Sequence, residues 1–132
     1  MTLHITALYA ALIGVWAVIL ANYVSINRGK LQVLLGDGGK PEMAAIIRRH
    51  ANLLENVPLA LILMGLAEGS GLSATWMHVL GVVLIISRLV HPFGITTEPK
   101  LSPLRVVGAV GTHAVTLAAS LFILWTAISA GV

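Results

Sequence analysis

The chain has 132 residues, of which 58% are hydrophobic and only 10% are charged, and its formal net charge is +3. A soluble domain has about 25% charged residues, so this composition is typical of an integral membrane protein. The small, dispersed positive charge argues against nucleic acid as a partner, and the absence of cysteine excludes disulfides, zinc–thiolate sites and a protein thiol nucleophile.

Long uncharged stretches predict four membrane-spanning helices, because about 20 apolar residues cross the core of a bilayer. Glycine and charged residues mark the end of the first helix, and Pro41 suits the first position of the second. Ser73 and Ser102 are the expected N-caps of the third and fourth helices. We therefore expect an all-α, four-helix membrane bundle forming a single domain over residues 1–132, with helices at about residues 3–27, 41–68, 73–95 and 102–129.

Lysine and arginine occur only in the first and third connections and in the helix ends beside them. The second connection and both terminal segments contain neither residue. By the positive-inside rule, the two basic loops are expected in the cytoplasm and both termini on the opposite side of the membrane.

Polar residues gather at the expected cytoplasmic ends of three helices. On the second helix they have the i, i+4, i+7 spacing that places side chains on one face, and on the third they are spaced i, i+3. The last of them lies in the first turn of the fourth helix, near its positive dipole end. They are Arg48, Asn52, Glu55, Arg88, His91 and Arg105.

The charges in this set do not balance. Glu55 lies about 10 Å of helix rise from Arg48, at a depth where a charge needs a partner. An internal salt bridge to Arg48 or to Arg88 is one explanation. However, with the adjacent Arg49 included, four arginines lie near one carboxylate and leave positive charge uncompensated, which predicts an anionic ligand. Glutathione has carboxylates, an ammonium group and the thiol that the chain lacks. The spacing of the histidines does not indicate a metal site.

The polar residues also match a known family. The second-helix run is the most specific part, and the match extends over nearly the whole chain. The glycine-rich turn at residues 36–39 and the Ile-Arg-x-His start at residue 47 are similar to the bacterial branch. The sequence resembles the MAPEG family (membrane-associated proteins in eicosanoid and glutathione metabolism) in three runs: Arg48-x-x-x-Asn52-x-x-Glu55-x-x-Pro58, Arg88-x-x-His91, and Lys100-Leu101-x-Pro103-x-Arg105.

This resemblance implies a homotrimer surrounded by membrane lipid that holds glutathione between neighbouring subunits as co-substrate. The similarity to the bacterial branch implies a bacterial inner membrane. The implied activity is that of a glutathione transferase or peroxidase acting on a lipophilic small-molecule electrophile. Arg105 would be the catalytic residue that stabilises the thiolate. The implied glutathione-binding residues are Arg48, Asn52, Glu55, Arg88, His91 and, as a weaker candidate, Arg28.

Two other functions remain open. Ile95 stands where several family members carry a tyrosine, so a non-catalytic membrane protein that binds lipid or glutathione-like ligands is the alternative. A small transporter ranks last, because transport predicts ionisable residues near the membrane midplane. Among the other polar residues, packing or interface roles are expected for Arg49, His50 and Asn56, and a hydrogen bond within the bundle for His113.

Overall fold

The computed structural model describes residues 3–131, and all the regular structure within that range is helical. The elements are α1 (His4–Leu31), α2 (Pro41–Gly69), α3 (Ala74–Val90), a short 3-10 helix η1 (His91–Gly94), and α4 (Pro103–Ser129). Taking α3 together with η1, four helical segments are long and apolar enough to cross a membrane. The prediction of an all-α protein with four potential membrane spans is confirmed.

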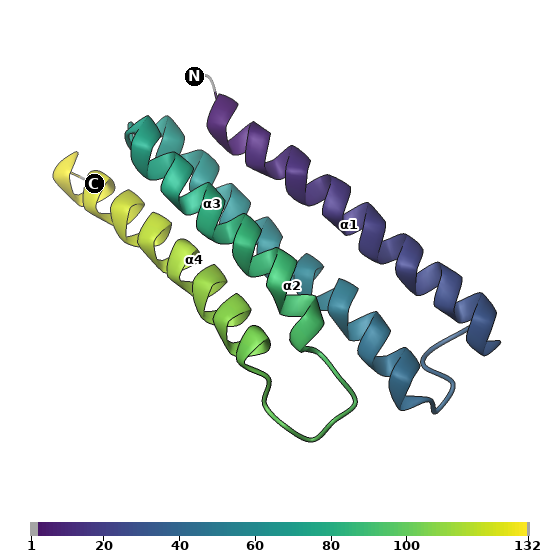
Figure 1. The fold of residues 1–132 in the computed structure, drawn as a ribbon. Helices are drawn as coiled ribbons and strands as arrows, with labels where there is room; N and C mark the ends of the chain where they lie inside the picture. Colours follow the sequence, from purple (N-terminus) through teal and green to yellow (C-terminus); the bar gives the residue numbers. More distant parts are fainter. Residues whose placement is uncertain (1–2, 132) are drawn as a thin grey trace.

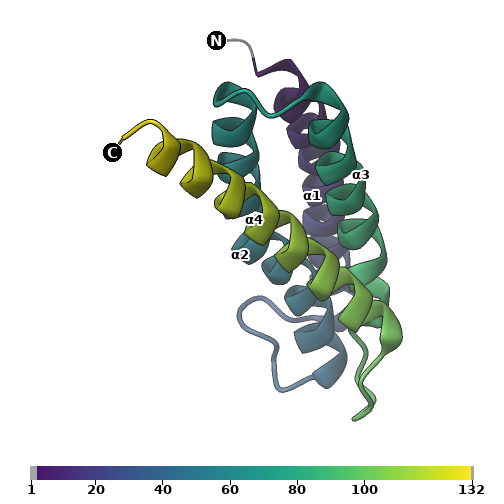
Figure 2. The ribbon, with the colours of Figure 1, turned by 90° about the vertical axis from the view of Figure 1, so that its left-hand side faces the viewer.

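The four long helices run side by side, with α1 and α4 on opposite sides of α2 and α3 (Figures 1 and 2). Apolar side chains such as Tyr9, Leu53, Met64 and Leu84 fill the space between them. Large apolar side chains also cover the outer faces of the helices. An apolar exterior of this kind is what a lipid environment permits.

The two long connections lie at one end of the bundle, and the α2–α3 turn lies at the other end with the start of α1 and the end of α4 (Figure 1). The lysines and arginines, which occur in those connections and the adjoining helix ends, therefore gather at one end of the molecule. This is the arrangement on which the predicted membrane orientation depends.

The first helix extends one turn beyond its predicted end. Gly29 lies inside α1, and the helix ends at Leu31, followed by Gln32 in the left-handed conformation with φ of 55°. The Arg28 guanidinium donates to the backbone oxygen of Gly36 at 2.9 Å and so holds the loop against the helix end. The predicted boundary is wrong because a helical glycine costs only about 1 kcal/mol, which such contacts offset.

The third helix is shorter than predicted. Pro92 lacks the N–H that would bond to the carbonyl of Arg88, and α3 gives way to η1 at residue 91. Trp16 on α1 supplies the missing donor, because its Nε1 lies 3.0 Å from that carbonyl oxygen. A helix continuing to Ile95 is therefore wrong, and Ile95 lies in extended backbone after η1.

The predicted helix starts are confirmed in position. Pro41 and Pro103 occupy the first positions of α2 and α4, and Ser73 and Ser102 are the N-cap residues of α3 and α4. Neither serine makes a side-chain capping hydrogen bond.

The N-terminus of α1 is capped by a residue that is distant in the sequence, Glu68 at the end of α2. Its two carboxylate oxygens accept from the backbone N–H groups of Ile5 and Thr6, at 2.9 and 2.8 Å.

Replacing Glu68 with alanine should lower the free energy of unfolding by about 1 kcal/mol, because two N–H groups at the positive end of α1 lose their acceptor. Thermal unfolding of the protein in detergent measures the change. Glu98→Ala removes an exposed carboxylate from the connection before α4 and should leave the transition unchanged. Equal transitions for wild type and Glu68→Ala would contradict the capping role.

Candidate functional site

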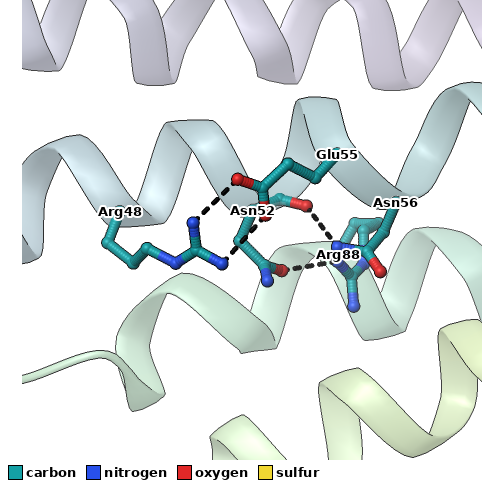
Figure 3. Close-up of polar contacts among 5 residues, drawn as sticks. All are labelled: Arg48, Asn52, Glu55, Asn56 and Arg88. Atoms are coloured by element: carbon teal, nitrogen blue, oxygen red, sulfur yellow. Dashed lines mark hydrogen bonds and ion pairs between the residues drawn. The ribbon is translucent and has the colours of Figure 1, made fainter.

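An ion pair on the outer face of α2 forms one side of the site (Figure 3). Arg48 and Glu55 make two parallel contacts, with Nη1–Oε1 at 2.7 Å and Nη2–Oε2 at 2.9 Å. Both side chains are about half exposed, at 51% and 50%. Of the two partners that the sequence allowed for Glu55, the structure selects Arg48, and it leaves the pair accessible from outside the chain.

Arg88 lies behind this pair and is 2% exposed. Its Nη1 donates to Oδ1 of Asn52 on α2 at 3.1 Å, and its Nη2 donates to the backbone oxygen of Gly108 on α4 at 2.6 Å. Asn56 donates in turn to the backbone oxygen of Asn52 at 2.9 Å (Figure 3). Together with Trp16 at its carbonyl, Arg88 connects all four long helices.

A close approach of α4 to the end of α3 makes these contacts possible. At Gly108, an added Cβ would lie 2.6 Å from Cβ of His91 and 2.8 Å from the backbone oxygen of Ser87. At Gly111, an added Cβ would overlap the hydroxyl of Ser87. The two glycines let α3 and α4 pack closely, which brings His91, only 4% exposed, against α4.

Arg105 lies in the first turn of α4 and is exposed. Its side chain makes no hydrogen bond to a residue that the structure describes. Gly94 of η1 lies directly against the backbone of Arg105, and a Cβ there would overlap the Arg105 backbone nitrogen. Gly94 therefore fixes the start of α4, and hence Arg105, relative to His91. The sequence gives no direct signal for this role, because a glycine in a Pro-rich connection is ordinarily read as a turn.

Two arginines are held away from this cluster. Arg28 binds the first loop, as described above, so its guanidinium is already occupied by backbone oxygens. Arg49, the neighbour of Arg48, donates from Nε and Nη2 to the backbone oxygen of Ile95, at 3.1 and 2.9 Å. Ile95 is buried beneath it and is not aligned with Arg88 and His91 on a continuing helix. The packing roles expected for Arg49 and Asn56 agree with their contacts.

The prediction that His113 makes a hydrogen bond within the bundle is wrong. It is exposed on α4, and within residues 3–131 its ring has no hydrogen-bond partner. The prediction assumed that an isolated polar group in a membrane helix finds a partner within the bundle, whereas this side chain lies on the exposed face of α4.

The charges of the cluster can now be assigned. Glu55 neutralises Arg48, and this is the one ion pair within 4.0 Å among the residues described. Arg88 is buried with neutral acceptors only, and Arg105 has no carboxylate partner in the same part of the chain. No group of three or more potential metal ligands occurs among the described residues. The arrangement is suited to an anionic ligand, since guanidinium groups bind carboxylates well.

The fold and the cluster define a four-helix membrane protein with an arginine-rich polar site at one end. The sequence profile of the MAPEG family matches residues 6–125, and the chain belongs to that family. It is 38% identical over 91 residues to the inner membrane protein YecN of Escherichia coli K12, a match covering 68% of this chain and 69% of YecN. YecN of Escherichia coli O6:H1 matches to the same extent.

Proposed function

We propose that the chain is a trimeric glutathione-dependent transferase or peroxidase of a bacterial inner membrane, with its basic loops in the cytoplasm and both termini on the opposite side. The observation that carries this proposal is the buried guanidinium of Arg88, which has neutral acceptors only, behind an exposed ion pair. A buried charge without a counter-charge is costly. A ligand carboxylate near Arg48, Asn52 and Arg88 would lower that cost.

The Arg48–Glu55 pair would receive the two ends of glutathione by exchange of partners. A ligand carboxylate takes the place of Glu55 on the Arg48 guanidinium, and the ligand ammonium then pairs with Glu55. Arg48 and Glu55 then each keep a partner of opposite charge. The half-exposed position of the pair allows a neighbouring subunit to close the site.

We assign to Arg105 the role of stabilising the ligand thiolate. Its charge and the positive end of α4 both favour the thiolate, which is the nucleophile in such reactions. In a transferase step, the thiolate sulfur forms a bond to an electrophilic carbon, and the leaving group departs with its electron pair. A lipophilic electrophile would arrive from the surrounding lipid, because large apolar side chains cover the outer faces of the helices.

Calorimetric titration of the detergent-solubilised wild type with glutathione should show binding, and Glu55→Gln should weaken it at least about tenfold, because the ligand ammonium loses a charged partner. Glu98→Gln, which removes an equivalent charge outside the site, should bind as the wild type does. Absence of binding by the wild type would eliminate the proposed function.

The second candidate function is that of a non-catalytic membrane protein that binds lipid or a glutathione-like ligand in the same site. The observation that favours it is the buried, apolar side chain of Ile95, which offers the site no hydroxyl. Normal glutathione binding together with no conjugation across a panel of lipophilic electrophiles would establish this function in place of the first.

A further inference from the structure

Three hollows follow one another along α1. The middle one, about 230 Å³, is lined by Trp16, Ile19, Leu20, Tyr23, Arg49, Pro92 and Phe93. It shares Trp16 with a hollow of about 150 Å³ that reaches Leu12. It shares Tyr23 and Arg49 with a third, of about 180 Å³. We refer to these three hollows together as the α1 groove.

Most of the α1 groove is apolar. Between Leu12 and Tyr23 it follows α1 for about 16 Å, at 1.5 Å of rise per residue. Its wall on the opposite side is formed by apolar residues of α3 and η1, among them Ile85 and Phe93. Phe93 remains 66% exposed. This length and lining match a lipid acyl chain lying beside a membrane-spanning helix.

The end of the groove nearest the basic loops is polar and carries both signs of charge. Arg49 and Glu42, seven residues apart on α2, line it together with Thr96 and Thr97. Arg49 uses Nε and Nη2 for the Ile95 carbonyl, which leaves Nη1 without an acceptor among the described residues. Glu42 is exposed, and in the same part of the chain its carboxylate has no ion-pair or hydrogen-bond partner.

We propose that the α1 groove binds a phospholipid whose headgroup carries a phosphate and a primary ammonium, as in phosphatidylethanolamine. Arg49 binds the phosphate through Nη1, Glu42 binds the ammonium, and an acyl chain lies along α1 past Trp16. The charges of the two side chains match those of this headgroup, with one of each sign. A glycerol headgroup leaves Glu42 unpaired, and a trimethylated ammonium cannot donate a hydrogen bond to it.

The headgroup end of the α1 groove is distinct from the site proposed for glutathione, and Arg88 is the residue that the two share, because it also lines the hollow that reaches Leu12. Arg48 and Arg49 are consecutive on α2 and therefore point about 100° apart. Arg48 is paired with Glu55 and Arg49 with the backbone of Ile95. Recognition of the headgroup by Arg49 and Glu42 is therefore tested independently of glutathione binding.

The test is lipid retention by the purified full chain in detergent, measured by native mass spectrometry. The protein is equilibrated with equal amounts of phosphatidylethanolamine, phosphatidylglycerol and phosphatidylcholine that carry identical acyl chains. We expect phosphatidylethanolamine to be retained about fivefold over each of the other two, the ratio that one exposed ion pair can provide. Glu42→Gln should reduce both ratios to within about twofold.

Glu42 is exposed and its carboxylate has no ion-pair partner among the described residues, so its neutral variant should remain folded. Glu98→Gln is the matched control and should keep the wild-type preference. Phe93→Ala should lower the retention of all three lipids without changing their ratio, because it shortens the apolar wall alone. Equal retention of the three lipids by the wild type, or an unchanged preference in Glu42→Gln, would overturn the proposal.

Discussion

Replacing Arg105 with alanine should slow glutathione conjugation by about 100-fold or more, while glutathione affinity changes by no more than about threefold. The reason is that Arg105 would stabilise the negative charge of the thiolate, whereas the ligand carboxylates would be bound by other arginines. Its side chain is exposed and makes no hydrogen bond to a described residue, so the substitution should leave the fold intact. Initial rates with a lipophilic electrophile and calorimetric titration separate the two quantities.

Two controls make this prediction specific. Lys100→Ala removes a cation from the connection just before α4 and should leave the rate unchanged. Arg105→Lys keeps the charge but not the planar guanidinium and should recover part of the rate. The thiolate absorbance of the bound ligand at neutral pH should be present in the wild type and smaller in Arg105→Ala. Equal absorbance in the two proteins would remove Arg105 from this role.

Replacing Gly108 with alanine should lower the free energy of unfolding by about 2–3 kcal/mol, the usual cost of inserting a methyl group into close-packed surroundings. The added Cβ would meet backbone and Cβ atoms, which cannot rotate away. Separating α4 from α3 would also lengthen the hydrogen bond between Arg88 and the Gly108 carbonyl. Thermal or denaturant unfolding in detergent measures the loss.

Gly14→Ala provides the matched control, because nothing lies within 4 Å of a Cβ added at that helical glycine. It should be neutral or more stable by about 0.5–1 kcal/mol, since alanine loses less conformational entropy in a helix. Similar stabilities for Gly108→Ala and Gly14→Ala would show that the contact between α3 and α4 is less tight than the structure indicates.

Three features could be predicted because each depends on residues that are close in the sequence. They are the number of helices, the prolines that begin α2 and α4, and the shared face of Arg48, Asn52 and Glu55. Hydrophobic length and helical periodicity determine such features locally. The choice of Arg48 over Arg88 as the partner of Glu55 could not be predicted, since both were within reach. It depends on Asn52 and the Gly108 carbonyl, which occupy the Arg88 guanidinium.

Two contacts in the structure were not predicted from the sequence, and both join residues that are far apart in the chain. The Glu68 carboxylate caps a helix that begins more than 60 residues earlier in the chain. Trp16 donates to a carbonyl that Pro92 leaves without its usual partner. Neither residue has a spacing motif relative to its partner, so only the packed arrangement of the helices reveals these contacts. Pro92 itself is visible in the sequence. Because a proline lacks the N–H that would bond to the carbonyl four residues earlier, its position identifies the Arg88 carbonyl as the one left without a helical partner.

The contacts of Arg88 also bear on how the chain assembles during synthesis. One acceptor for its guanidinium, Asn52, precedes it in the sequence, whereas the other, the Gly108 carbonyl, follows it. The hydrogen bonds of the guanidinium are therefore completed only after α4 has entered the membrane. Until then α3 carries a partly satisfied charge, which disfavours its release into lipid. Insertion of α4 thus completes the hydrogen bonds of the Arg88 guanidinium.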